Sequence, residues 1–119
     1  MPMVYEPYPI IFTAKVSTEI NNMLENVALR QRKTKSDIIR QSIEMFLQKP
    51  LLDMEDPYHQ FPYTKVLTFK ATKDLASRID AFCFTSNLSI SKLVRFSILL
   101  YLQKNGMNDE YTVEKIRFL

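Results

Sequence analysis

The chain has few of the residues on which small catalytic and metal sites depend. Its 119 residues include one glycine, one cysteine, one histidine and no tryptophan. A single glycine excludes a glycine-rich phosphate loop, and one cysteine with one histidine excludes both a zinc cluster of these ligands and a credible catalytic triad. We therefore expect a protein that is not an enzyme and that has no cofactor and no metal.

Long apolar runs and signal-peptide features are also missing. No stretch approaches the roughly 18 residues of a membrane span. Residues 1–10, MPMVYEPYPI, lack the basic region and apolar core of a signal peptide. A lone cysteine cannot build a disulfide framework, which suits a reducing compartment. These absences predict a soluble intracellular protein with no membrane partner.

The chain does have an internal repeat with a period of 55 residues. FTAKVSTEI at 12–20 returns as LTFKATKDL at 67–75, and TKSDIIRQSIEMFLQK at 34–49 returns as SISKLVRFSILLYLQK at 89–104, without a gap. A chain of this length can build one core but not two independent ones. The repeat therefore predicts two half-domains that share a single core.

Charge is concentrated on the repeats. Residues 10–49 carry seven basic and four acidic side chains, residues 65–104 carry seven and two, and the remainder has a net charge of −5. This distribution indicates that the repeated units face a polyanion. Charged, solvated helix faces would explain the charge alone equally well.

Each unit begins with a strand pattern. In residues 10–16, apolar and polar positions alternate with a period of two, and the same alternation recurs in residues 65–71. The expected inward residues are Phe12, Ala14, Val16, Leu67, Phe69 and Ala71. Because a lone seven-residue strand is marginal, we predict that the two strands pair as an antiparallel ribbon. Residues 50–64 could span about 50 Å when extended, enough for pairing within the chain. A domain-swapped dimer is the alternative.

Two stretches of helical periodicity follow each strand. Ser17 or Thr18 offers an N-cap for the first helix, and Thr34 with Asp37 has the form of a capping box for the second. In the second unit, Asn87 marks the break between helices and Ser89 caps the later one. The expected buried positions are Ile20, Leu24, Val27, Ala28, Ile38, Ile39, Ile43, Phe46, Leu47, Leu75, Ile79, Phe82, Cys83, Leu93, Val94, Ile98, Tyr101 and Leu102.

These patterns divide the chain into four parts. We expect an N-terminal arm with the first unit at 1–49, a proline-rich acidic linker at 50–64, the second unit at 65–104, and a tail with a short helix at 105–119. The last helix of the second unit is apolar nearly all round, because it carries Phe96, Leu99 and Leu100. The linker, the tail or another protein must cover that face, and we favour packing within the chain.

Strand, helix, polar turn and Ser/Thr-capped helix, with Thr13 and Lys15 pointing outward, resemble the ribbon-helix-helix family of DNA-binding regulators. The resemblance covers about 80 of the 119 residues and is to a tandem single-chain form. It implies a mainly α fold with one two-stranded antiparallel ribbon, in a pseudo-dimer that shares one core. The implied function is sequence-specific regulation of transcription, as by a repressor. Tandem forms are similar to some regulators of archaeal viruses and to accessory proteins of plasmid transfer. A viral protein of this kind would be located in the host cytoplasm.

The resemblance assigns base contacts to the outward residues of the ribbon, which would enter the major groove of double-stranded DNA. They are Ile11, Thr13, Lys15, Val66, Thr68 and Lys70. Lysine suits guanine O6 and N7, and threonine suits several acceptors or a thymine methyl group. Alternatively, Ile11 and Val66 lie at a frayed strand end beneath the N-terminal arm. Because the outward residues match between the repeats, we expect a pseudo-palindromic operator, with self-association of further chains on DNA.

Phosphate contacts are assigned to the start of each second helix and to the basic turn of the first unit. They are Arg30, Arg32, Lys33, Thr34, Lys35, Ser36, Ser89, Ile90 and Ser91. Free backbone N–H groups at a helix N-terminus attract anions, although capping alone would also explain Thr34 and Ser89. The second unit lacks the basic turn, so we expect the first to dominate the salt dependence of binding. Arg32 stands where many family members have glycine, which puts the geometry of that turn in question.

Two alternatives involve the rest of the chain. An antitoxin-like or plasmid-transfer accessory protein would bind a protein partner through the last helix and tail as well as DNA. The linker carboxylates Asp53, Glu55 and Asp56 could hold a cation, but we favour a solvated acidic loop.

Overall fold

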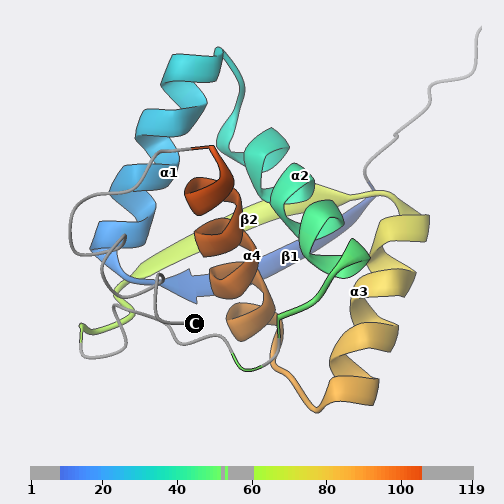
Figure 1. The fold of residues 1–119 in the computed structure, drawn as a ribbon. Helices are drawn as coiled ribbons and strands as arrows, with labels where there is room; N and C mark the ends of the chain where they lie inside the picture. Colours follow the sequence, from blue (N-terminus) through green and yellow to red (C-terminus); the bar gives the residue numbers. More distant parts are fainter. Residues whose placement is uncertain (1–8, 52, 54–60, 106–119) are drawn as a thin grey trace, which may run out of the picture.

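The computed structural model describes residues 9–51, 53 and 61–105, to which the structural statements below refer. One order of elements, a strand followed by two helices, occurs twice (Figure 1). The elements are β1 (Ile10–Val16), α1 (Thr18–Gln31), α2 (Lys35–Gln48), β2 (Lys65–Ala71), α3 (Lys73–Ser86) and α4 (Ile90–Lys104). The two strands form one antiparallel ribbon within the chain. The predicted fold class, mainly α with one two-stranded ribbon in a pseudo-dimer, is confirmed.

The register of the ribbon is symmetric with respect to the repeat. Thr13 lies opposite Thr68, and these two residues are equivalent at the period of 55. On either side of them, Ile11 lies opposite Lys70 and Lys15 lies opposite Val66. Exchanging equivalent residues leaves this pairing unchanged, so a pseudo-two-fold axis passes through the Thr13–Thr68 pair.

A hydroxyl caps the start of every described helix. The side chains of Ser17, Thr34, Thr72 and Ser89 each accept a hydrogen bond from the backbone N–H three residues later. The N-cap of α1 is thus Ser17 rather than Thr18, and the cap at Thr72 was not predicted. Such a cap satisfies one of the backbone donors that a helix start leaves without an intrahelical partner.

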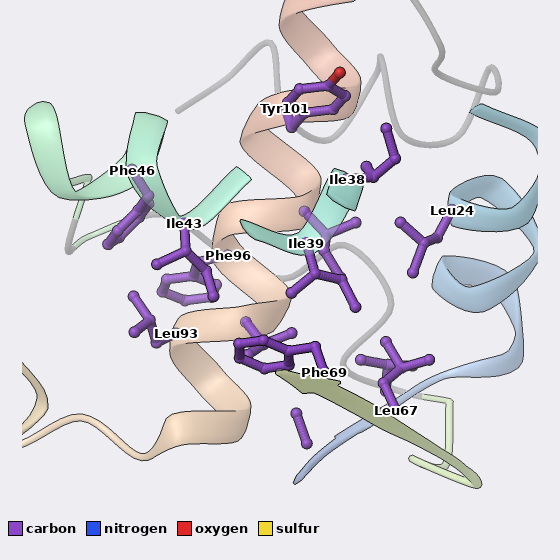
Figure 2. Packing of buried hydrophobic residues seen from close by; sticks show 14 of the residues in the cluster. Leu24, Ile38, Ile39, Ile43, Phe46, Leu67, Phe69, Leu93, Phe96 and Tyr101 are labelled. Atoms are coloured by element: carbon purple, nitrogen blue, oxygen red, sulfur yellow. The ribbon is translucent and has the colours of Figure 1, made fainter. Parts of the chain in front are cut away.

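The core lies between the inner face of the ribbon and the helices, where α2 and α4 lie side by side across the ribbon (Figure 1). Figure 2 shows side chains from both helices, among them Ile39 and Leu93, gathered over Phe69 of β2. The helix positions predicted as buried are buried, except that Leu47, Phe82 and Cys83 are partly buried and pack against the core.

The inner face of the ribbon is not symmetric. The rings of Phe12 and Phe69 stack with their centroids 5.4 Å apart, whereas the equivalent pair across the pseudo-axis is Leu67 and Ala14. Two large side chains thus pack on one side of the axis, and a large one with a small one on the other. A core tolerates exchanges of large for small side chains as long as its total volume is kept. The outward face is not packed and is under no such constraint.

The extra apolar face of α4 is covered within the chain. Phe96, Leu99 and Leu100 are at most 4% exposed, and Phe61 at the end of the linker is among the side chains that pack against the core. The predicted tail helix and most of the linker, including Glu55 and Asp56, lie outside the described residues.

Candidate nucleic-acid interface

The six residues predicted to contact bases share the outer face of the ribbon, and all of them are exposed. Across the strands, one lysine lies beside one β-branched apolar residue in each half, as Lys15 beside Val66 and Lys70 beside Ile11. Ile11 and Val66 are 60% and 59% exposed, so neither is packed beneath another described part of the chain, and the N-terminal arm at 1–8 lies outside the described residues. The face therefore presents two equivalent halves around a central pair of threonines.

The backbone of each outward lysine is held by the other unit. Arg95 Nη1 of α4 donates to the Lys15 carbonyl oxygen at 2.9 Å, and Arg40 Nη1 of α2 donates to the Lys70 carbonyl oxygen at 2.8 Å. The Lys15 N–H also donates to Ser91 Oγ, at 3.0 Å. Both strands of a two-stranded ribbon are edge strands, so these contacts satisfy polar groups that the ribbon itself leaves unpaired.

Sequence reasoning missed the two arginines as part of the site. Their signal was present, because Arg40 and Arg95 are identical residues at repeat-equivalent positions. Charged residues on a helix are, however, usually solvated, and only the tertiary structure shows that these two guanidinium groups turn inward to the ribbon.

The starts of α2 and α4 differ in charge. At α2 the Thr34 N–H donates to Asp37 Oδ2 at 3.3 Å and the Asp37 N–H donates to Thr34 Oγ1 at 3.0 Å, which confirms the capping box. These hydrogen bonds with Thr34, together with Arg40, lower the pKa of Asp37. The repeat-equivalent residue in α4 is Lys92, and the first turn of α4 has no acidic residue. The first turn of α4 thus carries a lysine, whose Nζ lies 5.5 Å from the centroid of the Phe96 ring, whereas the first turn of α2 carries a carboxylate.

The basic turn of the first unit keeps its charges at the surface. Arg30, Arg32 and Lys33 are exposed. Arg32 adopts the left-handed conformation with φ 56°, and the Lys33 N–H donates to the Ala28 carbonyl oxygen at 2.9 Å. Asn87 has the same φ in the second unit. The substitution of arginine for glycine therefore preserves the turn, at the steric cost of a side chain in this region.

Most of the other residues predicted to contact phosphate are partly buried or already have a polar partner in the chain. Lys35 Nζ lies 3.4 Å from both Asn21 Oδ1 and Glu25 Oε2, so part of its charge is neutralised by α1. Ser36, Ile90 and Ser91 are partly buried, whereas Thr34 and Ser89 are exposed. The Ser91 hydroxyl accepts from Lys15 and retains a proton to donate.

The described part of the chain contains no group of three or more His, Cys, Asp or Glu side chains that could hold a metal ion. None of its helices has the length and apolar character that crossing a membrane would require. Asp53 is exposed, and the other two linker carboxylates lie outside the described residues.

No protein-family model matches the chain, and no curated protein or solved structure matches it either.

Proposed function

We propose that this chain is a tandem ribbon-helix-helix protein that binds double-stranded DNA sequence-specifically and regulates transcription, without a catalytic role. The repeated strand-helix-helix order and the antiparallel ribbon are compatible with that family. The observation that carries the proposal is the outer face of the ribbon, which is exposed and symmetric although the inner face is not. Selection for a two-fold symmetric ligand explains this difference, because core packing alone puts no constraint on exposed residues.

The major groove of B-DNA is wide enough for a two-stranded β-ribbon. In that position Lys15 and Lys70 reach guanine O6 and N7, and the neighbouring Val66 and Ile11 contact thymine methyl groups. Thr13 and Thr68 lie over the centre of the site. The expected operator is an inverted repeat in which each half contains a guanine close to a thymine.

Phosphates on either side of the groove bind at the helix starts and at the basic turn. The N-terminus of α4 offers backbone N–H groups with Lys92 in its first turn, and the first unit offers Arg30, Arg32 and Lys33. Because α2 carries Asp37 in its first turn, the first unit binds phosphate mainly through the turn and the second mainly through the helix start. We therefore expect the first unit to dominate the salt dependence of DNA binding less than its basic turn alone would suggest.

Self-association on DNA is part of the proposal. The two most exposed large apolar side chains of the described residues, Leu29 at 80% and Phe84 at 90%, are repeat equivalents near the ends of α1 and α3. These two ends lie on opposite sides of the molecule (Figure 1). Neighbouring copies on a long operator would meet there. Phe84→Ser should then lower the cooperativity of binding to adjacent sites and leave the affinity for one site unchanged, and an unaltered binding isotherm would contradict this contact.

The proposal is tested by selecting bound sequences from random double-stranded DNA and footprinting the protein on them. We expect an inverted repeat centred on the ribbon. In the Lys15→Ala and Lys70→Ala variants, discrimination against non-specific DNA should fall by about 1–3 kcal/mol for each lost base contact.

The matched controls are Lys49→Ala and Lys104→Ala. These lysines are exposed and repeat-equivalent, but they lie at the ends of α2 and α4. Their loss should leave discrimination unchanged. A selected site without inverted symmetry, or equal losses in all four variants, would show the ribbon assignment to be wrong.

A further inference from the structure

The outward lysines differ in how firmly their backbone is held. At both Lys15 and Lys70 the carbonyl oxygen accepts from an arginine of the other unit, at 2.9 and 2.8 Å. At Lys15 the N–H is also held, because it donates to Ser91 Oγ at 3.0 Å. Within the described residues, no equivalent bond joins Ser36 to the N–H of Lys70.

Each of the two arginines has a further contact besides the carbonyl oxygen of its lysine. The guanidinium of Arg95 lies over the ring of Tyr63, 4.0 Å from its centroid, and a cation–π contact of this kind restrains the guanidinium plane. Arg40 forms an ion pair with Asp37, whose carboxylate also belongs to the capping box of α2. Arg95 thus contacts the last residues of the linker, and Arg40 pairs with a carboxylate of its own helix.

We propose that Ser91 and Arg95 are positioning residues for Lys15, and that the operator half read by Lys15 is therefore discriminated more strictly than the half read by Lys70. A side chain discriminates between bases more strictly when its position is held to within about half an ångström of the required geometry. Two hydrogen bonds, one at each peptide group that flanks the Lys15 Cα, restrict its displacement, while one bond leaves Lys70 freer to adjust. The pseudo-palindrome is thus read unequally by a face of symmetric composition.

The proposal rests on the function proposed above, and its physical basis can be measured without DNA. Amide hydrogen exchange, followed by NMR on the full chain, should show the Lys15 N–H better protected than the Lys70 N–H. In Ser91→Ala the exchange of the Lys15 amide should become about fivefold faster, as expected for the loss of one hydrogen bond, and that of Lys70 should not change. Ser36→Ala is the matched control, and it should leave both amides unchanged. Equal protection of the two amides in the wild type would overturn the proposed additional restraint of Lys15 by Ser91.

The second measurement uses the selected operator with single base-pair substitutions in each half. The half read by Lys15 is identified as the one whose substitution penalty disappears in Lys15→Ala. In the wild type, this half should show the larger penalty. Ser91→Ala should reduce the penalty there by several-fold and leave the penalty in the other half unchanged.

The outcomes separate three explanations. A uniform loss of affinity for all DNA in Ser91→Ala, with the penalties in both halves unchanged, would mean that Ser91 acts on a phosphate and not on Lys15, which overturns the positioning role. Equal penalties in the two halves of the wild-type operator would overturn the difference in strictness. Absence of any selected DNA would remove the proposed function itself, whereas the exchange measurement would still decide whether Ser91 restrains the backbone of Lys15. Arg95→Lys, which keeps the charge but not the planar fork, provides a second variant if Ser91→Ala alters the fold.

Discussion

Arg78 of α3 donates to both carboxylate oxygens of Glu44 in α2, with Nη1–Oε1 and Nη2–Oε2 distances of 2.7 and 2.9 Å. The hydrogen bonds with Glu44, supported by Asp74, raise the pKa of Arg78 above its ordinary value. The repeat equivalents of Arg78 and Glu44 are Met23 and Leu99, which are both apolar. The contact between the two units is therefore ionic on one side of the pseudo-axis and apolar at the equivalent positions on the other. Two copies of the same unit could not reproduce this match, which favours pairing between unlike units.

Reversing one charge of this pair should destabilise the fold, and reversing both should restore part of the loss, because a carboxylate at position 78 would lie beside Asp74. Both side chains are 44% exposed, so we expect a coupling free energy of about 1 kcal/mol, at the upper end for surface pairs because the geometry is bidentate. The measurement is urea unfolding of Glu44→Arg, Arg78→Glu and the double variant. Strictly additive losses would show that the pair contributes nothing.

Removing the hydroxyl of Tyr101 should cost about 1 kcal/mol of unfolding free energy. This hydroxyl lies 2.9 Å from Gln31 Oε1 and 3.3 Å from Gln41 Oε1, and it joins α4 to α1 and α2. The repeat equivalent is Phe46, which is fully buried and packs edge-on against Phe82.

The matched variant for Tyr101→Phe is Phe46→Tyr, which adds a hydroxyl where the structure provides an aromatic neighbour. It should destabilise by about 1–3 kcal/mol, because a buried hydroxyl without a partner loses its hydration. Thermal or denaturant unfolding measures both changes. A neutral effect of Phe46→Tyr would mean that the core can supply a polar partner there.

Arg32→Gly should stabilise the protein and weaken DNA binding at the same time. Glycine adopts the φ of 56° without the steric cost that arginine bears, which is worth about 0.5–1 kcal/mol. If Arg32 neutralises one phosphate, its loss lowers the slope of log affinity against log salt by roughly 0.9.

The control for these opposite effects on stability and DNA binding is Asn87→Gly, at the same φ in the second unit. Its effect on stability should be smaller, because asparagine tolerates the left-handed region better than arginine does. The salt dependence of binding should not change, since Asn87 carries no charge. Equal salt slopes for the wild type and Arg32→Gly would remove Arg32 from the phosphate contacts.

Asp37→Asn should lower stability at neutral pH by about 0.5 kcal/mol, as expected for a partly exposed charge at a helix start. The pKa of Asp37 is lowered below its ordinary value of 3.8 by the hydrogen bonds with Thr34 and by Arg40. A lowered folded-state pKa gives stability that is fully present above the ordinary value and is lost as the pH falls through the folded-state pKa. The difference between the wild type and Asp37→Asn should therefore shrink below pH 3.8.

Denaturant unfolding at pH 7 and pH 3 measures this difference, with Asp80→Asn in the middle of α3 as the control for an exposed charge. A difference that stays constant across the two pH values would assign the effect of Asp37→Asn to its shape and not to its ionisation.

Local patterns of sequence were sufficient for much of the fold. The alternation around Thr13 and Thr68 predicted both strands and the faces they present, because successive strand residues point to opposite sides. Thr34 and Ser89 were predictable caps because a hydroxyl before an apolar periodic stretch satisfies a free backbone N–H. The cap at Thr72 was missed, although it has the same local chemistry.

The candidate site was predictable only in part. The outward residues of the ribbon follow from alternation alone. Arg40 and Arg95 do not, because their role depends on carbonyl groups 30 and 80 residues away in the sequence. The aligned repeats show that Asp37 and Lys92, which have opposite charges, are equivalent residues at the two helix starts. The effect of this difference on anion binding depends on where the capping box directs the Asp37 carboxylate.

The sequence by itself determined the repeat, the identity of its elements and the exposed composition of the ribbon face, because these depend on interactions within a few residues of each other. The tertiary structure decided the rest. It placed Thr13 opposite Thr68, brought the arginines of each unit to the strand of the other, and gave Lys15 one more hydrogen bond than Lys70. Edge carbonyl and N–H groups must find partners wherever the chain brings them, and only packing in three dimensions determines which side chain arrives.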